Sequence, residues 1–299
     1  MKLPDLMNSL TNRIHIIIDS TLIKIKWRRK LSYPLNLRTP TTFNEKIQWL
    51  KLYSRKPIHT LCADKLLVRD YVEERIGQES LIPLLWSGTD PNRIPFQNLP
   101  DEYIIKTSHT SSRNILVKDS HMLIRGVAHP FEKNLLLKTL TKYLRENYYK
   151  RYREWQYKNI TPTIVVEHLL KNPDNSEIAN YKFSCFNGNV EFIEVQLSKF
   201  DRRSYGVNYY TPQWKLLPFT MGSEVNVRSE ISPPQNLDKM LTIAHSLAAE
   251  FPFARVDLYN QDGRIFFGEL TFHPAGGFVP FNPPEWDAIF GKMLRLPNE

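Results

Sequence analysis

The stretch RVDLYNQDGRIFFGELTFHP, residues 255–274, constrains the fold more than any other part of the chain. Two runs of β-prone residues flank NQDG, and Asp-Gly between such runs is the strongest short signal for a β-hairpin. Each arm carries one acid among apolar neighbours, Asp257 and Glu269. We expect the two acids to share a face of the hairpin, where they are either neutralised by Arg255 or Arg264 or arranged to hold a cation.

The order of the predicted elements indicates an α+β chain. Residues 1–60 are predicted to be helical and basic, and within them Thr42 or Asn44 before Glu45 is a capping signal for a helix over residues 41–53. The other expected elements are, in order, a helix over 62–76, a strand within 79–88, a strand–loop–strand unit over 101–119, a helical region over 130–158, a β-rich run over 162–171, a hairpin over 180–196 and an amphipathic helix over 236–251.

Composition narrows the class of protein. No apolar run approaches the roughly 20 residues needed to span a bilayer, because Asp19 and Lys24 interrupt the best candidate, residues 14–25. Two cysteines form no disulfide or metal-binding pattern, so a reducing, cytoplasmic setting is expected. The formal charge is +9, part of it within residues 24–30. Without a nucleic-acid-binding motif, this favours anionic lipid or a phosphorylated small molecule over nucleic acid, and a solvated basic face explains the charge equally well.

Two lysines stand where an anion would stabilise them. Lys106 ends the apolar strand YIIK, and the hydroxyl-rich loop 107–112 follows it. Such a loop can cradle phosphate oxygens, although a polar hairpin loop with a solvated lysine explains the pattern as well. Lys65 follows a helix-capping Asp64, where a cation opposes the helix dipole. A nearby anion would relieve that repulsion, and an ordinary surface lysine is the alternative.

Six segments in a fixed order carry a resemblance: FNEKIQWL, ADK, IIKTSH, EWQYKNI, NYKFSCFNG, and FPFARVDLYN with GELTFHPAGGF. The chain resembles the ATP-grasp superfamily, and more closely the TupA-like ATP-grasp family linked to teichuronopeptide and other surface-polysaccharide biosynthesis. The resemblance runs from about Phe43 to Asp287. It implies two α+β subdomains that clasp ATP, preceded by a helical segment. The implied boundaries are a basic segment over 1–60, a lysine-bearing part over 61–160 and a hinge and metal-binding part over 161–299.

The resemblance implies a set of nucleotide-binding residues. Lys65 and Lys106 match lysines that contact phosphates, and residues 109–114 stand where the family has a glycine-rich flap. Glu167 matches a hinge glutamate near the adenine. The implied set is Lys65, Lys106, His109, Ser111, Ser112, Glu167, Leu169 and Lys182. The flap here, HTSSRN, lacks the glycine that would permit a close backbone approach.

The resemblance also implies the metal and catalytic residues. Asp257 and Glu269 match magnesium-binding acids, and Thr271 takes the place of an asparagine that is often the third ligand. Threonine is a poorer ligand than asparagine. Arg255, together with Lys106, is implied to steady the transferred phosphoryl group.

Substrate residues are expected near the PAGGF turn. His273, Gly276 and Gly277 could bind substrate there, with a structural hydrogen bond as the alternative for the histidine. Arg202 and Arg203 could hold a phosphate or an acidic sugar, or form plain salt bridges.

The resemblance implies an ATP- and magnesium-dependent carboxylate–amine ligase of bacterial surface-polysaccharide biosynthesis. Its partners would be a carboxylate-bearing sugar or glycan acceptor, such as a uronic acid, and an amino acid or other amine. The alternatives are a sugar kinase, a glycosyltransferase, or a nucleotide-binding protein without full activity. The expected location is the cytoplasm, where residues 14–30 could lie on the anionic inner face of the membrane or pack on the domain.

Overall fold

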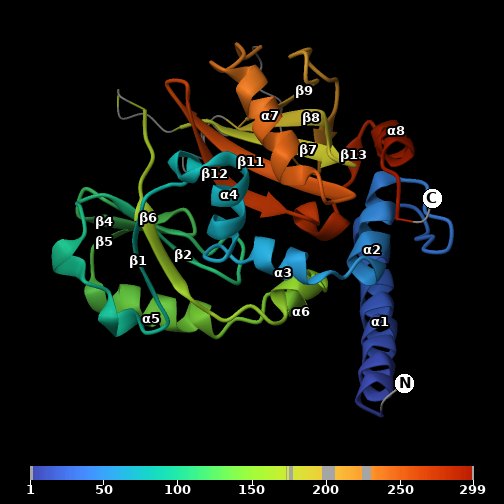
Figure 1. Ribbon diagram of the computed structural model, residues 1–299, viewed down its shortest axis with the longest axis horizontal. Helices are drawn as coiled ribbons and strands as arrows, with labels where there is room; N and C mark the ends of the chain where they lie inside the picture. The colour runs from blue at the N-terminus through green and yellow to red at the C-terminus, as the bar shows by residue number, and fades with distance from the viewer. Residues whose placement is uncertain (1–2, 173, 175–177, 197–205, 224–229, 298–299) are drawn as a thin grey trace.

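The computed structural model of the protein describes residues 3–172, 174, 178–196, 206–223 and 230–297. Two large antiparallel sheets, a two-stranded one and the surrounding helices make an α+β fold, as the sequence predicts (Figure 1). The helices are α1 (Leu3–Lys30), α2 (Phe43–Tyr53), α3 (Pro57–Ala63), α4 (Val68–Ile76), α5 (Lys133–Leu144), α6 (Tyr149–Tyr152), α7 (Leu237–Ala248) and α8 (Glu285–Met293). Short 3-10 turns include η4 (Trp155–Tyr157) and η5 (Pro274–Gly277).

A six-stranded sheet, in the order β1-β6-β2-β3-β4-β5, forms the smaller unit. Its strands are β1 (Leu84–Gly88), β2 (Tyr103–Thr107), β3 (Ile115–Lys118), β4 (His121–Ile124), β5 (Val127–Pro130) and β6 (Ile164–His168). Helix α5 packs Leu136 and Leu140 against Ile105, Ile115 and Val166 of this sheet. The hydroxyl-rich loop between β2 and β3 is thereby fixed at one edge of a well-packed layer.

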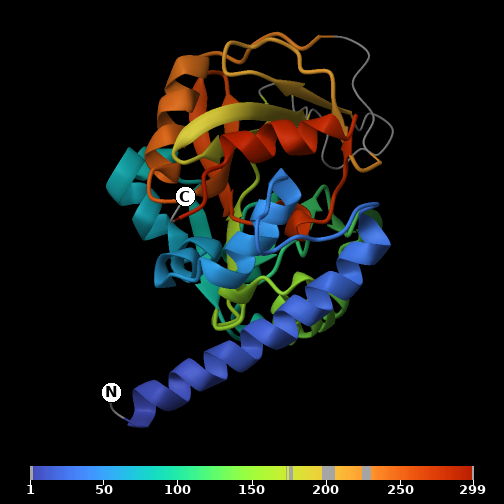
Figure 2. The ribbon, with the colours of Figure 1, turned by 90° about the vertical axis from the view of Figure 1, so that its right-hand side faces the viewer.

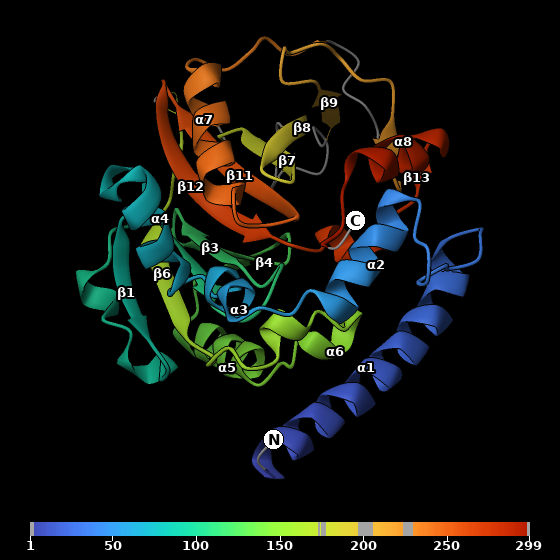
Figure 3. The same ribbon diagram turned by 45° about the vertical axis from the view of Figure 1, so that its right-hand side comes forward.

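A five-stranded sheet, in the order β12-β11-β7-β8-β9, forms the larger unit. Its strands are β7 (Asn180–Phe186), β8 (Asn189–Gln196), β9 (Val207–Tyr210), β11 (Phe253–Gln261) and β12 (Arg264–Thr271), and β10 (Thr220–Met221) pairs separately with β13 (Phe281–Asn282). Helix α7 buries Ala244 and Leu247 against Val256 and Leu258 of the sheet. In Figures 1 and 3 this sheet lies above the six-stranded one, with α7 on its outer side.

Helix α2 belongs to the core of the larger unit. Thr42 and Glu45 form the capping box that the sequence predicts. Phe43 stacks on Phe186, with ring centroids 5.4 Å apart, and both join the cluster that contains Phe290 of α8. The predicted division of the chain at residue 60 stays a prediction, and α2 lies before it.

Helix α1 runs along the outside of the molecule, with its N-terminal end projecting (Figure 2). Two residues of α1, Ile23 and Trp27, are buried against the rest of the chain in a cluster with Leu52 and Phe278. No helix within the described part of the chain combines the length and the apolar composition needed to cross a membrane.

One predicted helix is divided in two. The sequence predicts one helix roughly over 62–76 with Asp64 as a capping residue, but α3 ends at Ala63 and α4 begins at Val68. The carboxylate of Asp64 accepts the backbone N–H groups of Leu66 (2.8 Å) and Leu67 (3.3 Å), which turns the chain between the helices. The hairpins over 180–196 and 255–274 and the helix over 236–251 are confirmed.

Candidate active site

A row of ionisable side chains crosses four neighbouring strands of the five-stranded sheet. The register sets Asp257 of β11 opposite Glu269 of β12 and, on the other side, opposite Lys182 of β7. Lys182 lies opposite Glu194 of β8 and forms an ion pair with it. Val256 and Leu258 alternate with Asp257 and are packed under α7, so the row lies on the other face of the sheet.

A β-bulge sets the position of Glu269. The register shifts after Asp257, so that Leu258 pairs with Phe267 and Gly268 is left over. A Cβ atom on Gly268 would lie 3.0 Å from the carbonyl oxygen of Asp257. Glycine therefore permits this bulge, a device that redirects side chains beside functional sites.

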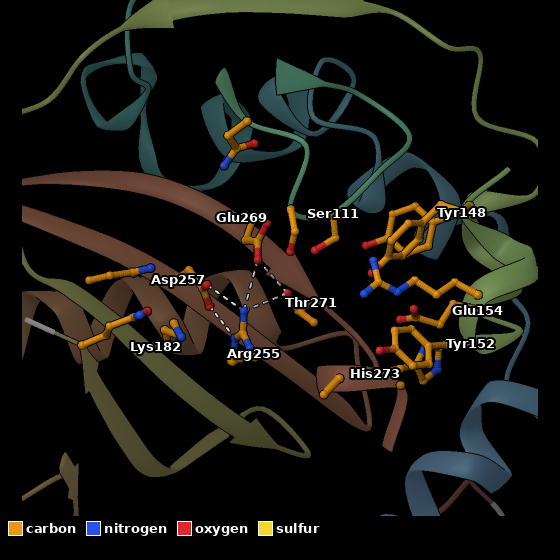
Figure 4. A pocket seen from close by; sticks show the side chains of 18 residues that line it. Ser111, Tyr148, Tyr152, Glu154, Lys182, Arg255, Asp257, Glu269, Thr271 and His273 are labelled. Carbon is orange, nitrogen blue, oxygen red and sulfur yellow. Dashed lines mark hydrogen bonds and ion pairs between the residues drawn. The ribbon is translucent and has the colours of Figure 1, made fainter. Parts of the chain in front are cut away.

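The three predicted metal ligands converge on one nitrogen atom of Arg255. Its Nη2 lies 2.8 Å from Asp257 Oδ2, 3.1 Å from Glu269 Oε1 and 3.3 Å from Thr271 Oγ1 (Figure 4). Its Nε donates to Asp257 Oδ1 over 2.7 Å. Burial raises the pKa of Asp257 to about 6, Glu269 adds to the rise, and Arg255 opposes it. The three oxygen-bearing side chains thus surround a single cationic position.

These residues line a cavity of about 360 Å³ between the two units. From the six-stranded unit, the β2–β3 loop contributes Ser111, Ser112 and Asn114. The region around α6 and η4 supplies a wall of aromatic and charged side chains. That wall consists of Tyr148, Arg151, Tyr152, Glu154 and Tyr157, and the rest of the lining is Asn180, Lys182, Gln196, Arg255, Asp257, Glu269, Thr271, His273, Ala275 and Gly276.

The β2–β3 loop adopts a glycine-like turn without glycine. Ser112 has a φ of 60°, in the left-handed region. For a residue other than glycine this conformation costs about 1–2 kcal/mol. Ser108 Oγ donates to Thr161 O over 3.0 Å, and Ser108 N donates to Thr163 O over 2.8 Å. These bonds tie the base of the loop to the segment before β6, so serine provides a turn that the resemblance associates with glycine.

Both predicted phosphate-binding lysines lie in a narrow pocket beside β12. Lys106 forms an ion pair with Glu167 over 2.7 Å, and Arg69 reaches the same carboxylate over 3.0 Å. Lys65 donates to the carbonyl oxygen of Thr110 in the β2–β3 loop. Burial opposes the charge on both lysines. At Lys106 burial is outweighed only by Glu167, Tyr259 and Glu269 together, which raise its pKa, whereas burial lowers the pKa of Lys65.

The narrow pocket and the larger cavity meet at β12. Phe267 and Gly268 line the pocket with the two lysines, and Glu269, the next residue, lines the cavity. The charge of Glu269 acts on both Lys65 and Lys106. The lysines therefore face the acidic hairpin across the gap between the two units.

Some predicted residues lie elsewhere. The ring of His109 is buried, with Nε2 3.1 Å from the carbonyl oxygen of Glu146, and it lines neither the cavity nor the pocket. Leu169 follows β6 and is half-buried. Gly277 faces α2 rather than the cavity. Arg202 and Arg203 lie outside the described residues.

His273 lines the cavity, yet its ring is already engaged. Its Nδ1 lies 3.1 Å from Gln156 Nε2, and the side chain is buried. Burial, with neighbouring Lys51 and His59, lowers its pKa well below the ordinary value. The ring is therefore neutral at physiological pH, and its hydrogen bond to Gln156 is the structural alternative that the sequence left open.

The N-terminal helices hold the walls of the cavity. Gln48 of α2 donates to the carbonyl oxygens of Gly276 (2.9 Å) and Gly277 (2.6 Å), and Lys51 donates to that of Gly276 (2.7 Å). In α1, the fully buried Asp19 accepts hydrogen bonds from Tyr149 and Arg153 around α6. The PAGGF turn and the α6 wall are thus fixed by helices that are distant in sequence.

Sequence reasoning missed the α6 wall as a functional surface. EWQYKNI, which contains Glu154 and Tyr157, is one of the segments that carry the resemblance, and the region 130–158 mixes aromatic and basic residues. Neither signal shows which of these side chains point into the cavity. That depends on Arg153, whose φ of 60° ends α6 and redirects the chain.

The family model described as TupA-like ATP-grasp matches residues 45–295, most of the chain. No protein of curated function matches the sequence.

Solved structures of similar fold include three ligases. The D-alanine–D-alanine ligase of Bacillus anthracis, complexed with ATP, is 13% identical with a TM-score of 0.40, over 71% of this chain and 54% of that one. The corresponding enzyme of Helicobacter pylori is 14% identical with a TM-score of 0.45, over 87% and 68%. A phosphoribosylamine–glycine ligase of Thermotoga maritima is 10% identical with a TM-score of 0.41, over 75% and 52%. This chain spans about half the length of the Bacillus anthracis ligase. The family match over residues 45–295 shows that this chain belongs to the TupA-like ATP-grasp family.

Proposed function

We propose that the protein is an ATP- and magnesium-dependent ligase that joins a carboxylate to an amine through an acyl phosphate. One observation carries the proposal: oxygens of Asp257, Glu269 and Thr271 converge on a single cationic nitrogen at the wall of a cavity. Phosphoryl transfer depends on positioning and charge neutralisation more than on covalent chemistry by the protein. A site built from acids, lysines and a hydroxyl-rich loop suits that requirement.

The donor set fits magnesium. Within the part of the chain that the structure describes, no group of three or more His, Cys, Asp or Glu side chains is placed to hold a metal ion. Two carboxylates and a hydroxyl suit Mg²⁺, which prefers oxygen ligands and usually keeps water and substrate phosphate oxygens. Arg255 Nη2 marks where a cation meets all three side chains. When bound, magnesium would neutralise phosphate charge as phosphoryl transfer proceeds.

The remaining residues take complementary roles. Lys65 and Lys106 bind the ATP phosphates. Glu167 orients Lys106 through their ion pair and lies near the adenine, and the backbone at Leu169 completes the adenine-binding end of the nucleotide site. Ser111 and Ser112 cover the phosphates from the β2–β3 loop. Arg255, displaced from its acids, binds the transferred phosphoryl group. Lys182 holds the sheet face by its bond to Glu194.

Ligation then exchanges one bond for another. The substrate carboxylate takes the γ-phosphoryl group and ADP leaves. The amine nitrogen attacks the acyl carbon, the carbon–oxygen bond to phosphate breaks, and phosphate leaves with that electron pair. The amine's surplus protons pass to phosphate and solvent.

We assign the substrates by the family resemblance, to a uronic acid or similar glycan carboxylate and an amino acid, in bacterial surface-polysaccharide assembly within the cytoplasm. The acceptor lies near Arg255 and the PAGGF turn, where Gly276 lines the cavity. His273 positions that turn through Gln156.

The test is an ADP-release assay over a panel of uronic acids and amino acids, with hydroxylamine added to trap acyl phosphate as hydroxamate. Asp257→Asn and Glu269→Gln should each lower turnover at least about 100-fold, because each removes one anionic ligand of the cation. ADP release with no acyl phosphate and no need for an amine would indicate a kinase. Transfer from a nucleotide sugar without ATP turnover would indicate a glycosyltransferase. Unchanged turnover in both variants would refute the site.

We also propose that α1 rests on an anionic lipid surface. Ile14, Ile17, Ile18, Leu22 and Ile25 are exposed, whereas Ile23 and Trp27 on the opposite side are buried, and Arg28, Arg29 and Lys30 form its last turn. An apolar stripe with a basic end suits such a surface. The chain should sediment with phosphatidylglycerol vesicles and not with phosphatidylcholine vesicles. Ile17→Glu should abolish sedimentation, and an unaltered result would refute the proposal.

A further inference from the structure

Glu154 is a buried acid that faces the cavity from the α6 wall. It is 3% exposed and follows Arg153, whose left-handed backbone ends α6. Arg153 is held by Asp19 through Nε (2.8 Å) and by the hydroxyl of Tyr149 (2.7 Å). Figure 4 shows Glu154 beside Tyr148 and Tyr152, across the cavity from Asp257 and Lys182. The fold therefore fixes this carboxylate on the wall that faces the acidic hairpin, near enough for the charge of Glu269 to act on it.

Among the described residues, no hydrogen bond or ion pair joins another side chain to this carboxylate, and its oxygens open onto the cavity. Lys51, the cation that acts on it most strongly, donates instead to the carbonyl oxygen of Gly276 and lies over the ring of Phe278. Burial raises the pKa of Glu154 to about 7. A buried carboxylate without a hydrogen-bonding partner is costly. A ligand cation that entered the cavity would remove that cost.

Arg151 supplies the opposite charge on the same wall. It is exposed, lines the cavity and lies three residues before Glu154. Its backbone carbonyl accepts a bond of 2.9 Å from Lys26 of α1, which anchors the chain while the guanidinium stays available. Guanidinium groups bind carboxylates with two parallel hydrogen bonds. One acid and one guanidinium on a single wall match the two charges of an α-amino acid.

We propose that Glu154 and Arg151 form the amine-substrate site, in which an α-amino acid lies with its ammonium group on Glu154 and its carboxylate on Arg151. This inference rests on the proposed ligase function and names the nucleophile of that reaction. The acyl-phosphate end of the cavity lies at Arg255, Asp257 and Glu269, so the two substrates approach from opposite walls.

Binding measurements with the full chain test the proposal directly. The protein is titrated with each common α-amino acid in the presence of Mg²⁺ and the ATP analogue AMP-PNP, by calorimetry. For the amino acid that binds best, Glu154→Gln should weaken binding at least about tenfold, since hydrogen bonds to charged groups carry that much affinity. AMP-PNP affinity should change less than about twofold, and Glu285→Gln, an exposed acid on α8, should leave both affinities unchanged.

The ligand provides a second set of controls. The N-acetyl form of that amino acid should not bind, because it lacks the ammonium group. Its carboxamide form should bind wild type and Arg151→Ala equally, because the partner of Arg151 is already gone. Equal amino-acid affinity in wild type and Glu154→Gln would overturn the inference, as would an absence of amino-acid binding while AMP-PNP binds. Failure of AMP-PNP and Mg²⁺ to bind would instead refute the proposed function.

Folding of the variant separates a binding role from a structural one. Glu154→Gln removes a buried charge but also the nearest counter-charge of the buried Lys51, and because these two effects have opposite signs, the melting temperature should stay within a few degrees of that of wild type. A melting temperature several degrees lower would show that Glu154 serves the fold, and would overturn the inference.

Discussion

Replacement of Asp19 by Asn should destabilise the protein strongly, because this single carboxylate joins three elements. It is fully buried. Oδ1 accepts from the hydroxyl of Tyr149 (2.6 Å) and from Nε of Arg153 (2.8 Å), and Oδ2 accepts from Nη2 of Arg55 (2.7 Å). The side chains of Arg55 and Arg153 are only 20% and 17% exposed, so water screens neither charge well. An amide in place of the carboxylate would leave two guanidinium groups without their counter-charge.

Removal of one partner from a buried ion pair costs about 3–5 kcal/mol. At about 2–4 °C per kcal/mol for a domain of this size, the melting temperature should fall by roughly 6–20 °C. Urea unfolding followed by circular dichroism measures the free energy of unfolding, and thermal melts measure the temperature shift. ADP release, measured where the variant is still folded, should also fall, since Arg153 sets the position of Glu154.

Asp101→Asn is the matched control, because Asp101 is exposed. That variant should stay within about 0.5 kcal/mol of wild type. If Asp19→Asn lowered the free energy of unfolding by less than about 1 kcal/mol, the reasoning would be refuted, because the three contacts would then contribute little beyond solvation.

Three further predictions concern pH, packing and ligands. Burial lowers the pKa of His59 to about 4. Its contribution to the free energy of unfolding is therefore complete above pH 6.5, where the imidazole is neutral in the folded and the unfolded state, and up to about 3 kcal/mol of it is lost as the pH falls through 4. Urea unfolding across this pH range should show that loss, and His59→Phe should flatten the pH dependence. Gly277 has a φ of 68°, and a Cβ there would lie 2.7 Å from Gln48 Nε2 and Ile47 Cγ2. Gly277→Ala should therefore lower the free energy of unfolding by about 2–4 kcal/mol. The loss should exceed that of Gly126→Ala, because Gly126 has a similar φ of 79° but lies in an exposed turn. MgATP at 100 times its Kd should stabilise the chain by about 2.7 kcal/mol, and EDTA or Asp257→Asn should remove most of the accompanying rise in melting temperature; a rise that survives both would count against the metal site.

The hairpins and the acidic site could be predicted because their signals are local. Asp-Gly between β-prone runs fixes one hairpin, and Asn-Gly fixes the other. Strand alternation then places Asp257 on the face opposite Val256 and Leu258. The register, by contrast, depends on the bulge at Gly268, and no local pattern announces a bulge. The sequence therefore predicts which two acids are neighbours but not the strand register that brings them together.

Contacts over long sequence separations were beyond such reasoning. The turn at Asp64 is local, and the sequence does indicate Asp64 as a helix-capping residue, although not that an earlier helix ends there. The bonds from Gln48 to Gly277 and from Asp19 to Arg153 span 229 and 134 residues. A buried acid in an aliphatic helix such as α1 signals a partner without identifying it. The direction of Glu154 depends on that partner, so the sequence does not predict the wall that we propose binds the amine.

The family match begins at residue 45, yet the candidate site depends on residues before it. Asp19 holds Arg153, which aims Glu154, and Lys26 of α1 binds the backbone of Arg151. The residues proposed to bind metal lie on the five-stranded sheet, whereas the wall proposed to bind the amine is braced by α1. If α1 also rests on lipid, membrane contact would act on the same helix that positions the amine site. Lipid binding and amine affinity should then change together, whereas AMP-PNP affinity should not.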